Sequence, residues 1–155
     1  MNFQVVALPR ETFEPLFAMD DATLRARGIE RRIDEEGGAP CRVSLEDSTP
    51  GETLYLLAHA HHDVRSPYRA AGPIFVRENA ITARPQPNEL PKMLERRLLS
   101  LRAYDVNAML VTSEVVEGAR LREAITTMFG REEVAYLHVH NARPGCFNCA
   151  VQRAP

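Results

Sequence analysis

The sequence is short of the residues and runs that mark secreted and membrane proteins. Its 155 residues include 3 cysteines, an odd and low number that does not make a disulfide framework. No apolar run approaches the ~20 residues that a membrane-spanning helix requires. The N-terminal segment lacks the basic and apolar regions of a signal peptide. We therefore expect a cytoplasmic protein with no membrane partner.

Lysine is almost absent as well. Lys92 is the only lysine among 19 basic residues, and the others are arginine. The arginines are spread along the chain and interleaved with acidic residues, and the net charge is -2. Such a balance predicts no non-specific attraction to nucleic acid or anionic lipid. No recognised nucleic-acid module accompanies the arginines, so we expect no nucleic-acid partner.

What is present is the composition of an ordinary globular protein, with 45% hydrophobic and 26% charged residues. The length suits one domain with a core of its own. We find no internal repeat and no low-complexity tract. We therefore predict a single domain over residues 1–155, and the sequence points to no particular cofactor or oligomeric state.

The apolar pattern predicts short strands joined by turns, with helices inserted between them. Apolar and polar residues alternate over 41–46, and Thr-Pro-Gly-Glu at 49–52 is typical of a tight turn. Residues 53–60 then form a second strand, with Leu54, Leu56 and Ala58 on one face and Tyr55, Leu57 and His59 on the other. These three segments predict a hairpin.

Two helices are predicted from local patterns. Asp20 is a good cap for a short helix over 21–27, and residues 118–129 form the best amphipathic helix of the chain. Strands that arrive in hairpins with intervening helices favour an α+β fold. We expect an antiparallel or mixed sheet with helices packed on one face.

The C-terminal segment is the most informative part of the sequence. Residues 134–141 are strand-like, and Ala-Arg-Pro-Gly at 142–145 is a turn. A two-residue period puts His138 and His140 on one face of this strand and Ala135, Leu137 and Val139 on the other. If the chain returns as a second strand, Cys146 joins the histidine face.

The returning strand also predicts where the neighbours of Cys146 lie. Strict alternation places Asn148 on the histidine face, and it places Phe147 and Cys149 on the apolar face.

This arrangement suggests a small-molecule-binding or enzymatic site. A thiol beside an imidazole can lose its proton and act as a nucleophile, so Cys146 is the candidate nucleophile and His138 and His140 are the candidate bases. Asn141 or Asn148 could orient the imidazole ring. The alternative is that both histidines are polar surface and Cys146 is a small, partly buried residue.

A loop over 61–73 is the second candidate region. Tyr68 and Arg69 there could clamp a carboxylate or phosphate of a small-molecule ligand, because a planar guanidinium fits both groups. The alternative is that Arg69 pairs with a protein carboxylate and holds the loop down. The neighbouring His59, His61 and His62 are more typical of a solvated strand end.

Two other functions remain open. Cys146 and Cys149 are spaced as half of a zinc site, which His138 and His140 could complete in a zinc-stabilised structural domain. Residues three apart in a strand point to opposite faces, which disfavours this set. The chain could also be a protein-interaction module without catalysis.

Four blocks of the sequence carry a resemblance to a known family, namely Pro40–Leu57, Ser66–Glu78, Leu98–Asp105 and His138–Ala154. They resemble the uncharacterised bacterial family called DUF1203. The resemblance spans nearly the whole chain and implies a single-domain bacterial protein, and it brings no activity, cofactor or catalytic residue. In that family a small residue such as alanine often stands at the position of Cys149.

Overall fold

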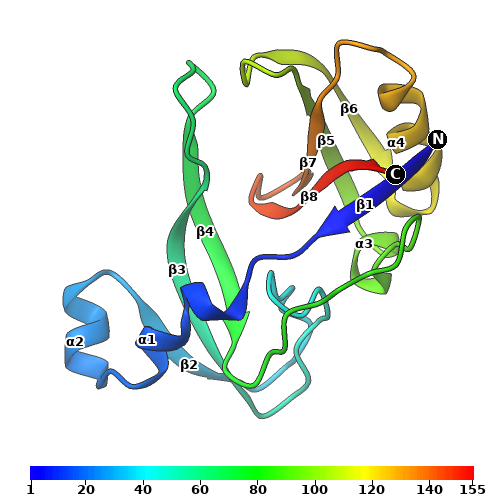
Figure 1. Ribbon diagram of the computed structural model, residues 1–155. Helices are drawn as coiled ribbons and strands as arrows, with labels where there is room; N and C mark the ends of the chain where they lie inside the picture. Colours follow the sequence, from blue (N-terminus) through cyan, green and yellow to red (C-terminus); the bar gives the residue numbers. More distant parts are fainter.

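The computed structural model describes residues 1–155 as two antiparallel sheets with a few short helices (Figure 1). The larger sheet has five strands in the order β1-β8-β7-β5-β6. Its strands are β1 (Asn2–Val6), β8 (Phe147–Ala154), β7 (Tyr136–Asn141), β5 (Leu98–Tyr104) and β6 (Leu110–Glu117). The smaller sheet has the order β2-β3-β4, with β2 (Glu30–Asp34), β3 (Glu52–His62) and β4 (Ala70–Arg77).

Helices cover one face of the five-stranded sheet. The predicted helix over 118–129 is present as a 3-10 turn, η2 (Gly118–Arg120), that continues into α4 (Leu121–Phe129). The apolar side of α4 packs on Leu101 and Val139 from the middle strands, and all lie in one buried cluster. The short helix α3 (Lys92–Glu95) adds Met93 and Leu94 to this cluster. The opposite face of β7 is therefore free to carry other side chains.

The three-stranded sheet has its own apolar cluster. The first helices of the chain pack there, namely η1 (Arg10–Thr12), α1 (Glu14–Phe17) and α2 (Asp21–Ala26). The predicted cap is confirmed, since the Asp20 side chain accepts a hydrogen bond from the Thr23 backbone N–H at 2.7 Å. The α+β class and the antiparallel sheets with helices are confirmed.

The predicted hairpin between 41–46 and 53–60 is wrong. β3 pairs with β2 and β4 instead. Residues 41–46 form tight turns, in which the Leu45 N–H donates to the Cys41 carbonyl at 3.0 Å and Leu45 has a φ of 53°. The alternation fails because Arg42, expected on the solvent side of a strand, is only 1% exposed.

The loop after β3 is shorter than predicted. β3 runs to His62 and β4 begins at Ala70, so His61 and His62 belong to the strand, which has a bulge between His59 and His62. No helix is long and apolar enough to cross a membrane.

A candidate thiol and imidazole site at the terminal hairpin

The predicted terminal hairpin forms from β7, a turn over 142–145 and β8. Its register shifts near the turn, where Val139 pairs with Cys149 but the next residue, His140, pairs with Phe147. One extra residue on β8 therefore opposes β7, which is a β-bulge. The bulge overturns strict alternation, so Phe147 lies on the histidine face instead of the apolar face.

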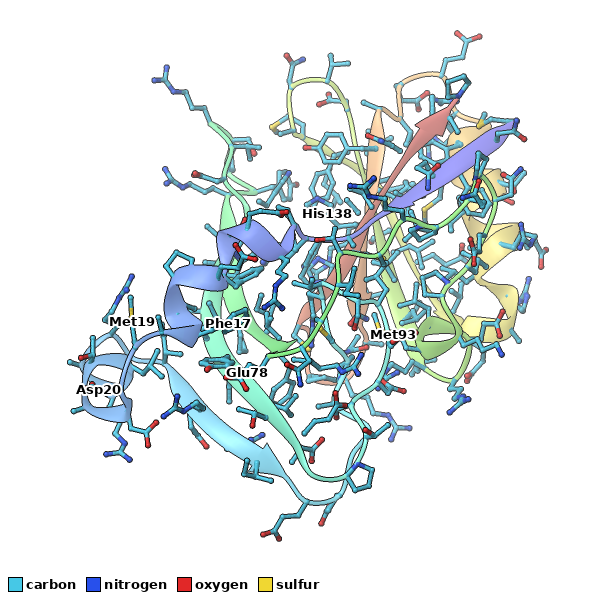
Figure 2. The ribbon with its side chains drawn as sticks, turned by 60° about the horizontal axis from the view of Figure 1, so that its bottom comes forward. Phe17, Met19, Asp20, Glu78, Met93 and His138 are labelled. Atoms are coloured by element: carbon cyan, nitrogen blue, oxygen red, sulfur yellow. The ribbon has the colours of Figure 1, made fainter.

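Two histidines from β3, His61 and His62, complete the histidine face of β7. His138 and His140 share one side of β7 as predicted, and both are buried. The ring of His61 lies 5.1 Å from the ring of His140 and 6.1 Å from the ring of His138, measured between centroids. In Figure 2, His138 lies above Met93 of α3, and Phe17 and Glu78 lie to the left, in the region of the smaller sheet.

Aromatic rings surround these imidazoles and keep water away from them. The Phe147 ring stacks on His61 at 5.1 Å and 12°, and it contacts the rings of His138 and His140 edge-on. Tyr104 and Tyr136 stack at 5.4 Å beside His138. We call this group the ring cluster; its members are His61, His62, Tyr104, Tyr136, His138, His140 and Phe147.

Burial of the ring cluster favours neutral imidazoles. Burial lowers the pKa of His138 to about 3 and that of His140 to about 4, with smaller contributions from neighbouring histidines and Arg102. Burial also lowers the pKa of His61. At neutral pH these rings therefore carry no charge.

Cys146 lies at the start of the bulge and is only partly exposed. Its sulfur accepts a hydrogen bond from Nη2 of Arg42 at 3.2 Å and another from Nδ2 of Asn141 at 3.3 Å. Neither His138 nor His140 hydrogen bonds to the sulfur. His140 instead contacts the residue that precedes Cys146, because its Nδ1 donates a hydrogen bond to the Gly145 carbonyl at 2.9 Å.

Arg42 is the unexpected member of the site. Its Nε donates to the Phe147 carbonyl at 2.7 Å, and its Nη1 donates to the Pro40 carbonyl. It makes no ion pair with a carboxylate. Burial lowers the pKa of the Arg42 guanidinium, while the adjacent Cys146 raises it. Because an arginine keeps its charge in proteins, the site holds a buried cation.

Asn141 orients the sulfur and not an imidazole. Its Oδ1 accepts a hydrogen bond from Nδ2 of Asn148 at 2.8 Å, which fixes the amide so that Nδ2 faces Cys146. Asn148 is fully buried. The two asparagines thus hold one donor in place at the thiol.

The two predicted loop residues have different positions. The Tyr68 carbonyl accepts a hydrogen bond from Nδ1 of His62 at 2.7 Å, and the Tyr68 ring lies 6.1 Å from that of Tyr104, at the edge of the ring cluster. Arg69 is not brought to the histidines. Its exposed side chain pairs with Asp63 at 2.9 Å, so its partner is a carboxylate of the same loop.

The four predicted zinc ligands are not brought together. Cys149 points into the core cluster of the larger sheet, on the opposite face from His138 and His140, and burial raises its pKa to about 12. No group of three or more histidine, cysteine, aspartate or glutamate side chains converges in a geometry that holds a metal ion.

Comparison with known proteins gives a family. A family model described as Protein of unknown function (DUF1203) matches residues 38–153, which is more than half of the chain. The chain belongs to the DUF1203 family. The matched region of this DUF1203 chain includes Arg42, His61 and the terminal hairpin as far as Arg153. No curated protein and no solved structure matches the chain.

Three residues of the candidate site in this DUF1203 chain are not predicted from the sequence. Arg42 stands at a position of the alternating segment 41–46 that is expected to face solvent, so the pattern does not indicate a buried site residue. His61 and His62 stand in a His-Ala-His-His segment that is typical of a solvated strand end, and only the packing of β3 against the hairpin brings them to the site.

Proposed function

We propose that this DUF1203 protein is a thiol-dependent enzyme in which Cys146 is the nucleophile toward an electrophilic carbon of a small molecule. The observation that carries this proposal is the buried guanidinium of Arg42, which has no carboxylate partner and donates to the Cys146 sulfur at 3.2 Å.

A buried cation requires an anionic or strongly polar partner, because removing its water costs several kcal/mol. Two of the three groups that Arg42 contacts are backbone carbonyls, which are neutral. The third is the Cys146 sulfur, the only contacted group that can become an anion. Arg42 is therefore placed to stabilise the negative charge of a group that reacts at this sulfur.

The hydrogen bonds at the sulfur support the same role. Both hydrogen bonds of the sulfur have it as acceptor, and within the protein it donates none. Hydrogen bonds to charged groups contribute about 1.5–3 kcal/mol, which corresponds to about ten- to a hundredfold in an equilibrium or a rate.

The proposed step is a displacement at carbon. The Cys146 thiol releases its proton to water, its sulfur donates an electron pair to the electrophilic carbon and forms a C–S bond, and the leaving group departs with the electrons of the bond that breaks. Arg42 and Asn141 hold the sulfur, and His140 positions the preceding peptide through the Gly145 carbonyl. Histidine as the base for Cys146 is not part of the proposal, because no imidazole contacts the sulfur.

Alkylation by iodoacetamide tests the proposal. The reagent forms a C–S bond and releases iodide, and peptide mass spectrometry resolves Cys146 from the buried Cys41 and Cys149. At neutral pH we expect Cys146 to react well before the other two. Arg42→Met should slow its reaction at least about tenfold, and Asn141→Ala should slow it less.

Arg25→Met is the matched control, since Arg25 is exposed and makes no ion pair or side-chain hydrogen bond. It should leave the rate unchanged. An Arg42→Met protein that is folded by circular dichroism and alkylated as fast as the wild type would contradict the proposal. If Arg42→Met does not fold, an unchanged rate in Asn141→Ala combined with a wild-type Cys146 no faster than glutathione would contradict it equally.

A further inference from the structure

A groove of about 980 Å³ lies between the tight turns over 44–49, the linker over 79–85 and the segment 89–96, which carries α3. Small-molecule sites in proteins have volumes of about 300–1,000 Å³. Neither Arg42 nor Cys146 lines this groove. A ligand in the groove would therefore be bound separately from the candidate thiol site.

The linker that forms one wall of the groove runs from the end of β4 toward α3 (Figure 1). The Ala83 backbone N–H donates to the Val43 carbonyl at 2.8 Å. The Arg10 backbone N–H donates to Oγ1 of Thr82 at 2.9 Å, and Nη1 of Arg10 donates to the Ala80 carbonyl at 2.8 Å. The wall is therefore held in place before any ligand arrives, which lowers the entropic cost of binding.

Two of the three acidic side chains of the groove are neutralised from outside it. Glu46 pairs with Arg77 at 3.1 Å, and Asp47 pairs with Arg97 at 2.7 Å. Neither arginine lines the groove. The third acidic residue, Glu89, accepts a backbone hydrogen bond and makes no ion pair. Only one carboxylate of the groove thus keeps an uncompensated charge.

The three basic side chains of the groove have no carboxylate partner. Arg84, Lys92 and Arg96 are exposed and make no ion pair. Lys92 and Arg96 are four residues apart, at the two ends of α3, so they lie on one side of that helix. Arg84 comes from the linker. Three free cations therefore face one free carboxylate in this groove.

We propose that the groove binds a small organic anion with two or more carboxylate or phosphate groups. Several free cations in one groove complement several negative charges on one molecule, and the planar guanidinium fits both acidic groups. Leu45 and Met93 also line the groove and are otherwise buried, with 3% of each exposed. They give the carbon skeleton of the ligand an apolar surface to contact.

The exposure of the three cations sets the expected affinity. Charge pairs in contact with water are weakened by the solvent and by salt, so removing one cation should weaken binding about two- to fivefold. For the same reason the affinity should decrease as the salt concentration rises.

Calorimetric titration of the full chain at constant ionic strength tests the site. The probes are citrate, which carries three carboxylates, and pyrophosphate, with acetate as the singly charged comparison. We expect at least one of the two polyanions to bind saturably at one equivalent, and we expect acetate to bind at least about tenfold more weakly. The polyanion with the higher affinity then indicates which acidic group the natural ligand carries.

Charge-removing variants locate the binding. Arg84→Gln and Arg96→Gln should each weaken it about two- to fivefold, and the double variant should weaken it further. Glu89→Gln should tighten it, because the free carboxylate repels the ligand. Arg65→Gln is the matched control, an exposed arginine beyond the opposite end of β4, and it should bind like the wild type. Cys146→Ser should also bind like the wild type, which keeps this test separate from that of the thiol.

Three results would overturn the assignment. They are no saturable binding of citrate or pyrophosphate, equal affinities in the wild type and in the double variant, or a loss in Arg65→Gln as large as that in Arg84→Gln. The substituted charged residues are all exposed, so we expect these variants to fold like the wild type.

Discussion

Arg42 and Cys146 are 104 residues apart in sequence, and their side chains meet at 3.2 Å. The guanidinium reaches this contact from a tight turn beside the smaller sheet, and the sulfur lies at the end of the terminal hairpin. The same guanidinium also bonds the backbone of Phe147 on β8. One buried side chain thus links the two sheets and holds the candidate nucleophile.

Replacing this arginine should destabilise the protein. Arg42→Met leaves the carbonyls of Phe147 and Pro40 buried without donors, and each such loss costs about 1–3 kcal/mol. We expect a free energy of unfolding lower by about 2–4 kcal/mol in urea denaturation. The exposed Arg25→Met should change it by less than about 0.5 kcal/mol, and equal effects in the two variants would contradict a structural role for Arg42.

Gly118 tests the packing of η2 against α3. A Cβ at this position would lie 2.1 Å from the Leu94 carbonyl oxygen and 2.6 Å from the backbone of Glu95. Gly118→Ala must therefore displace backbone, and we expect a loss of at least about 2 kcal/mol in thermal or urea unfolding. Gly72→Ala, with no atom within 4 Å of its Cβ, is the matched control and should be tolerated.

The ring cluster predicts that acid destabilises the protein. The folded-state pKa values of His138 and His140, about 3 and about 4, lie below the unfolded value of about 6.5. Between these values the unfolded chain binds protons that the folded protein does not, so stability is complete above about pH 6.5 and falls as pH decreases toward 4. Each group contributes a slope of up to about 1.4 kcal/mol per pH unit.

Urea denaturation between pH 7 and pH 4.5 measures this slope. His138→Gln should flatten the pH dependence, because it removes the group with the largest shift. A slope identical to that of the wild type would show that His138 is not held neutral by burial.

Phe147 should control the hydration of the imidazoles. Phe147→Ala removes the ring that contacts His61, His138 and His140, and we expect a loss of about 3–5 kcal/mol. Water then reaches the cluster, so the pKa of His138 should rise toward its ordinary value in an NMR titration. Phe75→Ala on the smaller sheet, where Arg32 lies over the ring, should leave this pKa unchanged.

The sequence predicts the parts of this fold that depend on local interactions. Asp20 caps its helix and 118–129 is helical because both depend on residues a few positions apart. The two faces of β7 also follow from a two-residue period, which places His138 and His140 together.

Long-range contacts explain what the sequence does not reveal. Arg42 is buried because its hydrogen-bond partners arrive from the other end of the chain, and no local pattern marks this. Phe147 changes face because a bulge shifts the register, and alternation cannot anticipate one inserted residue. His61 joins the site because β3 extends to His62, beyond the strand over 53–60 that the sequence predicts.

The alkylation rate of Cys146 tests its pairing with Arg42 most directly. The measurement is the rate constant of Cys146 toward iodoacetamide at neutral pH in the wild type, Arg42→Met and Arg25→Met, read by peptide mass spectrometry. We predict that Arg42→Met lowers this rate constant at least about tenfold and that Arg25→Met leaves it unchanged. Equal rate constants in the wild type and in a folded Arg42→Met protein would contradict the assignment of Cys146 as a nucleophile held by Arg42.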